Sequence, residues 1–217
     1  MNNAIKKYPN YNEAFLARAQ LLFCLSDFEN AIKDYRFVIS QDNNSGVGKT
    51  KIARIGLGDC FKSQKKYLQA MESYEEARKC ENISLKELHE RRAYTNYYLE
   101  NQEDALNDIQ IVSQNCESLT ISLLYLKGKI LYKLSLKKPE LFSESILTFE
   151  QVIMDEPQSL SSAKSLYRIA VGRISQKDFY EAFYTVQRYS QLNTPEYTKL
   201  LDLKKFIEGV NLIRLSP

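Results

Sequence analysis

The sequence predicts an all-α solenoid in which about five helical hairpins stack one after another. One observation is composition, because the 217 residues include only seven Gly and five Pro, and so few turn-forming residues favour long helices. The other observation is a motif that recurs five times, in which a small residue is followed by an apolar residue and, four positions after the small one, by a large apolar residue. These segments are DFENAIKDY, KYLQAMESY, NQEDALNDI, LFSESILTF and DFYEAFYTV.

Small residues, here termed anchors, set the period of the repeat. The anchors are Ala31, Ala70, Ala105, Ser145 and Ala182, spaced 39, 35, 40 and 37 residues apart. Four of them follow a second small residue by twelve positions: Ala19, Gly58, Ala93 and Ala170. Gly128 lies 17 residues before Ser145, which indicates five inserted residues. Antiparallel helices approach closely only where small residues face each other, so the motif predicts one helix crossing per hairpin.

At this period the sequence resembles the tetratricopeptide repeat (TPR) family, whose repeat is about 34 residues long. The resemblance covers nearly the whole chain and is strongest at Leu57, Gly58, Phe61, Tyr67, Ala70, Tyr74 and Ala77. Arg54 and Asn96 depart from it, since the family has large apolar or aromatic residues there. The late alanine is replaced by Val38, Val112, Val152 and Tyr189. The resemblance implies a right-handed α-solenoid that acts by presenting surface to other proteins.

The register of the repeat predicts a single array. Its predicted segments are 12–45, 51–84, 86–119, 121–159 and 163–194, with a capping helix at 195–214. Residues 1–10 are interpreted as the tail of a preceding repeat or, less favoured, as a short helical cap. Two sequences of the capping-box type, Ser26-x-x-Glu29 and Ser84-x-x-Glu87, predict helix starts close to these boundaries.

Composition argues against several classes of function. The net charge of +3, with 30 basic and 27 acidic residues, gives no indication of binding to nucleic acid or to an acidic membrane. Cys24, Cys60, Cys80 and Cys116 form no C-x-x-C pair, so we expect reduced core cysteines and no metal. No apolar run is long enough to span a bilayer and MNNAIKKYPN is polar, which favours a cytoplasmic protein, with cytoskeletal association as an option and secretion excluded.

The segment NNSGVGKT, Asn43 to Thr50, resembles a phosphate-binding loop. Gly48, Lys49 and Thr50 match the pattern, but Asn43 stands in place of the first glycine. A phosphate-binding loop follows a strand, whereas the residues before Asn43 have helical spacing. The segment is therefore predicted to be a solvated loop between hairpins, where its glycines let the chain turn, and no nucleotide is expected there.

The first helices of the hairpins are expected to line a concave groove for an extended peptide or a helix. Tyrosine dominates this groove from the third hairpin on, and it offers a large amphipathic contact area. The candidate partner-binding residues are Phe23, Tyr94, Tyr97, Tyr125, Lys129, Tyr132, Lys164, Tyr167 and Arg168. An alternative is left open, in which these tyrosines only pack between neighbouring hairpins.

A subset of the TPR family holds the C-terminal carboxylate of chaperones in a clamp of lysine, asparagine and arginine side chains. Lys164 and Arg168 match its last pair, but Glu90, Tyr94 and Leu126 occupy its earlier positions, so the clamp is not expected. Catalysis is not expected either, because the single histidine leaves no histidine-based catalytic set to assign.

The sequence therefore predicts a non-catalytic protein-interaction scaffold within a larger multiprotein assembly, without cofactor or metal. Such a scaffold would also use loop and edge surfaces, including Gly46 to Thr50 and the insert Leu136 to Leu141. The alternative is a peptide-binding adaptor or co-chaperone that uses only the tyrosine-rich groove.

Overall fold

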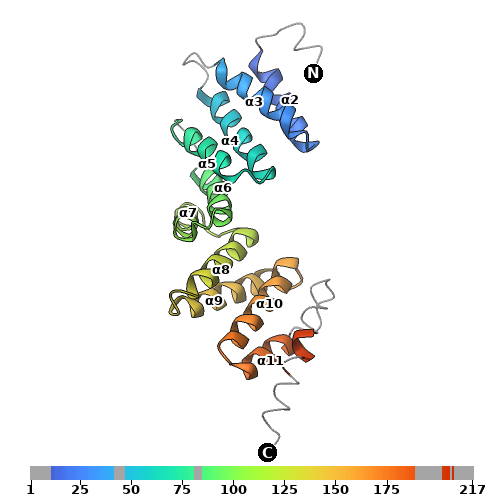
Figure 1. Cartoon of the computed structure of the whole chain (residues 1–217), viewed down its shortest axis with the longest axis vertical. Helices are drawn as coiled ribbons and strands as arrows, with labels where there is room; N and C mark the ends of the chain where they lie inside the picture. The colour runs from blue at the N-terminus through green and yellow to red at the C-terminus, as the bar shows by residue number, and fades with distance from the viewer. Residues whose placement is uncertain (1–10, 42–46, 81–84, 189–201, 206, 208–217) are drawn as a thin grey trace, which may run out of the picture. The chain divides into compact units, whose positions relative to one another are not determined.

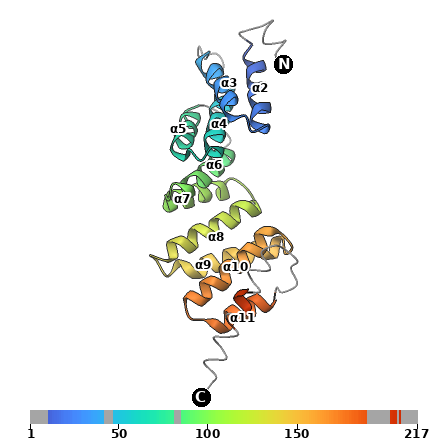
Figure 2. The ribbon, with the colours of Figure 1, turned by 45° about the vertical axis from the view of Figure 1, so that its right-hand side comes forward.

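The computed structural model describes residues 11–41, 47–80, 85–188, 202–205 and 207. These residues form ten helices in successive packed pairs and no strand, which confirms the all-α prediction (Figures 1 and 2). The chain divides into two compact units, Met1–Glu117 (unit 1) and Ser118–Pro217 (unit 2). In each hairpin we term the first helix A and the second helix B.

Unit 1 contains three hairpins. Their helices are α2 (Asn12–Cys24), α3 (Phe28–Ser40), α4 (Val47–Ser63), α5 (Tyr67–Arg78), α6 (Leu85–Tyr98) and α7 (Gln102–Gln114). The first two B helices also pack on the A helix that follows them, α3 on α4 and α5 on α6, while the A helices α2, α4 and α6 touch in turn. The A helices therefore form one layer of unit 1 and the B helices another.

Unit 2 contains two hairpins. Their helices are α8 (Ile121–Ser135), α9 (Leu141–Asp155), α10 (Leu160–Ser175) and α11 (Phe179–Arg188). Helix α10 packs on both α8 and α9. Residues 202–205 are helical, and Leu203 and the fully buried Ile207 pack against the core of this unit. The rest of the predicted capping helix at 195–214 lies outside the described residues, as does the predicted tail at 1–10.

The anchors lie at the helix crossings, as the sequence predicts. All five are completely buried, and so are Ala19, Ala93 and Ala170. A Cβ added to Gly58 would stand 2.4 Å from the Tyr74 ring, and one added to Gly128 would stand 2.6 Å from the Phe149 ring. The Ser145 hydroxyl donates a hydrogen bond to the Gly128 carbonyl across the α8–α9 crossing, at 3.0 Å. Close helix approach therefore explains why these positions are small.

The five inserted residues of the fourth hairpin are spread over its two helices and its turn. Helix α8 continues to Ser135, seven residues past Gly128, whereas α4 ends five residues past Gly58. The turn before Leu141 spans residues 136–140, while the equivalent turn of the second hairpin spans only 64–66. The insert therefore forms no separate structural element, and residues 136–140 of the segment Leu136 to Leu141 are an exposed turn.

The turns inside the other four hairpins share one conformation. Each contains a non-glycine residue with positive φ: Ser26, Lys65, Glu100 and Lys177. The following residue donates its N–H five positions back, as Asp27 does to the Leu22 carbonyl at 2.8 Å, which is the Schellman ending of an A helix. The predicted capping box at Ser26 is therefore wrong. Ser26 ends α2, and the Asp27 side chain caps α3 by accepting from the Asn30 N–H. Ser84 lies outside the described residues.

Replacing Lys66 by aspartate is expected to raise the free energy of unfolding by about 1 kcal/mol. Lys66 is the N-cap of α5 with φ −88° and ψ 67° but makes no side-chain cap, whereas Asp27 caps α3 at φ −83° and ψ 68°. An aspartate at position 66 can therefore accept from the free N–H groups of the first turn. Urea unfolding followed by circular dichroism measures the change, with Lys66→Ala as the control. A gain no larger than that of Lys66→Ala would argue against this account of the turn.

Candidate functional site

In unit 1 the predicted groove residues are all half-buried. Phe23 lies at the end of α2 with its ring centroid 5.7 Å from that of Phe28, across the turn. Tyr97 makes an edge contact with Tyr98 at 5.5 Å, and the Tyr98 ring stacks on Tyr67 at 4.8 Å. Tyr94 lies in the middle of α6. Phe23 and Tyr97 therefore pack around hairpin turns as well as facing solvent.

The A-helix face of unit 1 is also crossed by ion pairs between its own helices. Asp59 on α4 accepts from the Tyr74 hydroxyl at 2.6 Å and from Arg91 Nε on α6 at 2.9 Å. Lys62 Nζ lies 3.4 Å from the same carboxylate. Burial raises the pKa of Tyr74, and the Asp59 charge raises it further. These charges are engaged with one another within the protein.

The segment that resembles a phosphate-binding loop begins a helix. It follows α3, so the apolar run before it is helical as predicted and supplies no strand. Residues 47–50 are the first turn of α4, which corrects the expectation that Gly48 to Thr50 lie in a loop. Lys49 forms an ion pair with Glu13 of α2, and the Lys49 ammonium lowers the pKa of that carboxyl. Thr50 is buried. These contacts hold the start of α4 against α2, and residues 42–46 lie outside the described residues.

Unit 2 brings six of the predicted residues onto two neighbouring A helices. Tyr125, Lys129 and Tyr132 lie on α8, and Lys164, Tyr167 and Arg168 lie on α10, all half-buried. Lys129 Nζ stands 5.7 Å from the centroid of the Tyr125 ring, within the range of a cation–π contact. The Tyr132 ring lies against Gly172 of α10, where an added Cβ would be only 3.1 Å from it. This surface, termed the tyrosine face, thus combines aromatic rings with cations.

Charge is segregated between the helices of unit 2. The A helices α8 and α10 contain no Asp or Glu, and their cations are Lys127, Lys129, Lys133, Lys164, Arg168 and Arg173. The B helix α9 contains no Lys or Arg, and its acids are Glu144, Glu150 and Asp155. Sequence reasoning missed this feature because the charges of the whole chain nearly balance, although a count for each helix would have shown it. Lys127 pairs with Glu144 of α9 at 3.3 Å and Arg173 with Glu181 of α11 at 2.8 Å, so the tyrosine face has Lys129, Lys164 and Arg168 as its predicted cations. No Asp or Glu of α8 or α10 offsets them, so the tyrosine face is basic.

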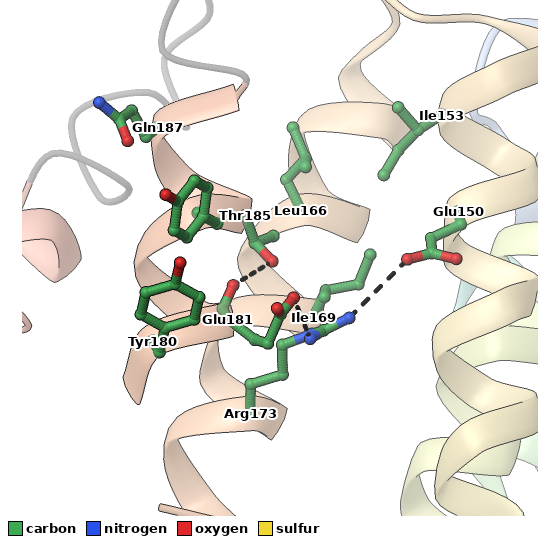
Figure 3. A pocket seen from close by; sticks show the side chains of 10 residues that line it. Glu150, Ile153, Leu166, Ile169, Arg173, Tyr180, Glu181, Thr185 and Gln187 are labelled. Atoms are coloured by element: carbon green, nitrogen blue, oxygen red, sulfur yellow. Dashed lines mark hydrogen bonds and ion pairs between the residues drawn. The ribbon is translucent and has the colours of Figure 1, made fainter. Parts of the chain in front are cut away.

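Two clefts open on the B-helix layers of the part of the chain that the structure describes, and none of the nine predicted residues lines either of them. The larger, of about 640 Å³, lies between α9 and α11 of unit 2 with α10 as its floor, and we term it the B cleft (Figure 3). Its lining comprises Glu150, Ile153, Leu166, Ile169, Arg173, Tyr180, Glu181, Tyr184, Thr185 and Gln187. The smaller, of about 330 Å³, lies at the equivalent place in unit 1, between α3 and α5 over α4.

An ion pair occupies the equivalent place in the first and third hairpins, which differ in this way from the second and fifth. In the first hairpin Arg18 donates two hydrogen bonds to the Asp34 carboxylate, at 2.6 and 2.7 Å. In the third, Arg92 bridges two B helices, with Glu75 of α5 at 2.8 Å and Asp108 of α7 at 3.5 Å. The same two positions, 16 residues apart, hold Leu57 and Ser73 in the second hairpin and Ile169 and Thr185 in the fifth. These four residues line the clefts. In the second and fifth hairpins the cleft therefore lies where the first and third hairpins have the ion pair.

Solved structures that resemble this chain are TPR proteins. YrrB, described as a TPR protein with an unusual peptide-binding site, aligns with a TM-score of 0.73 over 94% of this chain and 97% of its own, at 18% sequence identity. A TPR protein from Parabacteroides merdae aligns with a TM-score of 0.72 and 16% identity, over 93% of this chain and 75% of its own. Yeast Tom70 aligns with a TM-score of 0.65 and 19% identity over the whole chain, which spans 44% of Tom70.

The predicted resemblance to the TPR family is confirmed at the level of the fold. No family model matches the sequence, and no curated protein matches it either. None of the described helices combines the length and apolar character needed to cross a bilayer.

Proposed function

We propose that this chain, which has the fold of TPR proteins, is a non-catalytic protein-interaction scaffold within a larger multiprotein assembly. We further propose that the tyrosine face of unit 2 holds an acidic segment of a partner protein. One observation carries this proposal: Lys129, Lys164 and Arg168 lie with three half-buried tyrosines on α8 and α10, two helices that contain no carboxylate. A cytoplasmic location, with cytoskeletal association as an option, belongs to this proposal.

The chemistry of the tyrosine face suits an acidic segment with apolar side chains. Lys164 and Arg168 are one helical turn apart, so both can reach carboxylates of one bound chain. Tyr125 and Tyr132 lie against the core through Phe149 and Phe142, at ring distances of 5.8 and 6.4 Å. Rings held in place in this way lose little side-chain entropy when a partner covers them.

A peptide-binding adaptor or co-chaperone remains the second candidate, and the peptide-binding site of YrrB favours it. The chaperone clamp has less support, because Leu126 occupies one of its positions and is only 2% exposed. The two clefts on the B-helix layers favour a scaffold, since an adaptor with one groove has no use for them. The buried His89, hydrogen-bonded to Asp108 at 2.6 Å, is poorly placed to act as a catalytic base on a bound substrate.

Binding of labelled peptides to the full chain tests the tyrosine face. The probe is a fluorescein-labelled decapeptide with four glutamates and two phenylalanines, and its partner peptide has glutamine in place of each glutamate. We expect the acidic peptide to bind in a salt-dependent way, and Lys164→Glu/Arg168→Glu to weaken it by about tenfold or more. Lys65→Glu/Lys66→Glu, an equal charge change on an exposed turn of unit 1, is the control. Equal binding of both peptides, or an unchanged affinity in the double variant, would reject the site.

Cross-linking mass spectrometry of the native assembly separates the scaffold from the adaptor. A scaffold is expected to give links to other proteins from Lys137 in the exposed turn of the fourth hairpin and from Lys65 in that of the second. An adaptor is expected to give them only from the tyrosine face, at Lys129 and Lys164. Links confined to the tyrosine face would contradict the scaffold.

A further inference from the structure

We infer that the B cleft of unit 2 is a second docking site, and that it takes a segment of a partner protein in which a lysine or arginine stands beside a large apolar side chain. The site goes beyond the proposed function, because it lies on other helix faces than the tyrosine face and prefers a ligand of the opposite charge. Its occupant follows from the floor, the charges and the rim of the cleft.

The floor of the B cleft is apolar. Ile153 of α9 and Leu166 and Ile169 of α10 are buried members of the core that also line the cleft (Figure 3). The space above Ile169 is open because the side chain of Thr185 on α11 is short. Ile169 and Thr185 occupy the two positions that form the Arg–Asp pair in the first hairpin. An arginine and an aspartate occupy these positions in the first hairpin, where they bond directly. The cleft therefore has room for an apolar side chain from outside.

The charges of the B cleft favour a cation. Arg173 is its single cation among the described lining residues, and Arg173 Nη1 lies 2.8 Å from Glu181 of α11. The other carboxylate of the lining, that of Glu150 on α9, stands 3.9 Å from the guanidinium, and so does Asp178, which does not line the cleft. Among the described lining residues one cation thus faces two carboxylates, Glu150 and Glu181, whose side chains are 40% and 49% exposed. An incoming lysine or arginine can satisfy the excess acceptors, whereas an acidic side chain would be repelled.

The rim of the B cleft carries two exposed aromatic rings. Tyr180 and Tyr184 on α11 are 65% and 51% exposed, and their centroids are 4.7 Å apart. A hydrogen bond between the two side chains raises the pKa of Tyr180. Adjacent tyrosines with large exposed area are typical of the centre of a protein interface. Their rings can cover the apolar part of a bound segment and also attract its cation.

The smaller cleft of unit 1 is a natural comparison. It has about half the volume of the B cleft, and its charged lining is balanced, with Arg36 and Arg54 against Glu72 and Glu76. Arg54 also donates to the Glu76 carbonyl at 3.2 Å. No preference for a cationic ligand is expected there. Substitutions that fill the cleft of unit 1 with an Arg–Asp pair therefore serve as a matched control for the same substitutions in the B cleft.

Fluorescence anisotropy of the full chain with three labelled dodecapeptides tests the B cleft. The first peptide has a central Leu-Arg-Leu in a Gly-Ser background, the second has glutamate in place of the arginine, and the third has alanine in place of both leucines. We expect saturable binding of the first below about 1 mM, and binding of the other two weaker by about tenfold. Absence of saturable binding by the first peptide, or equal binding of the first and second, would overturn the inference.

The variants locate the site. Ile169→Arg/Thr185→Asp transplants the pair of the first hairpin into the fifth and is expected to reduce binding of the Leu-Arg-Leu peptide by about tenfold. Leu57→Arg/Ser73→Asp makes the same change in unit 1 and should leave binding unchanged. Glu150→Gln/Glu181→Gln removes the charge without filling the cleft, so it provides the test if the refilled protein loses its helicity, and it should weaken binding by about fivefold or more. Unchanged binding in a folded refilled variant and in the glutamine variant would refute the site.

Discussion

Replacing Asp108 by alanine is expected to lower the free energy of unfolding by about 3 to 5 kcal/mol. Asp108 on α7 is almost completely buried and joins three side chains of α6. His89 Nδ1 lies 2.6 Å from one carboxylate oxygen and Asn96 Nδ2 lies 2.9 Å from the other, while Arg92 Nε stands 3.5 Å away. Without the carboxylate His89 and Asn96 stay buried and lose a partner, and Arg92 loses one of its two carboxylates and keeps only Glu75, at 2.8 Å.

The equivalent pair in the first hairpin provides the control. Asp34→Ala also breaks an Arg–Asp pair, but the Arg18 side chain is 29% exposed against 16% for Arg92. Arg18 can recover water as a partner, so the loss is expected to be smaller, about 1.5 to 3 kcal/mol. Urea unfolding gives the two losses, and native-state hydrogen exchange shows whether α6 and α7 lose protection together. Equal losses in the two variants would contradict the role assigned to the buried network.

The repeat could be predicted because close packing restricts side-chain size. Ala31 and Ala105 sit where two backbones meet, so only small residues fit there, and the restriction repeats once per hairpin. Even the departures of Val38 and Val112 from the TPR pattern remain apolar and buried, as a core position requires. Size and polarity are visible in the sequence, and the fold followed from them.

Pairing of polar groups could not be predicted in the same way. In the sequence, Asn96 stands where the TPR pattern has an aromatic residue. Only the structure shows that its side chain donates a hydrogen bond to Asp108 of the next helix. Ser26 matches a capping box, yet its positive φ places it in the ending of α2. The B cleft exists because positions 169 and 185 lack the arginine and aspartate that form an ion pair in the first hairpin. A motif search finds residues that are present and does not detect a missing pair. These features depend on geometry between helices, which spacing along the chain does not encode.

Replacing Gly58 by alanine is expected to destabilise the protein by about 2 kcal/mol, although alanine is the better helix former by about 1 kcal/mol. The new Cβ on α4 would stand 2.4 Å from Cε1 and 2.7 Å from Cδ1 of Tyr74 on α5. The Tyr74 ring is completely buried, and its hydroxyl donates to Asp59 at 2.6 Å. The ring therefore cannot move aside without losing packing or this hydrogen bond, and the helices must separate instead.

A double-mutant cycle with Tyr74→Leu tests this explanation. The smaller leucine gives up the hydrogen bond to Asp59 but leaves room for the alanine Cβ, so Gly58→Ala should cost little in that background. We expect a coupling energy of about 1 kcal/mol or more from urea unfolding of the four proteins. A cost of Gly58→Ala that is the same in both backgrounds would show that the Tyr74 ring does not cause it. Glycine would then be required at position 58 for a reason other than the α4–α5 crossing.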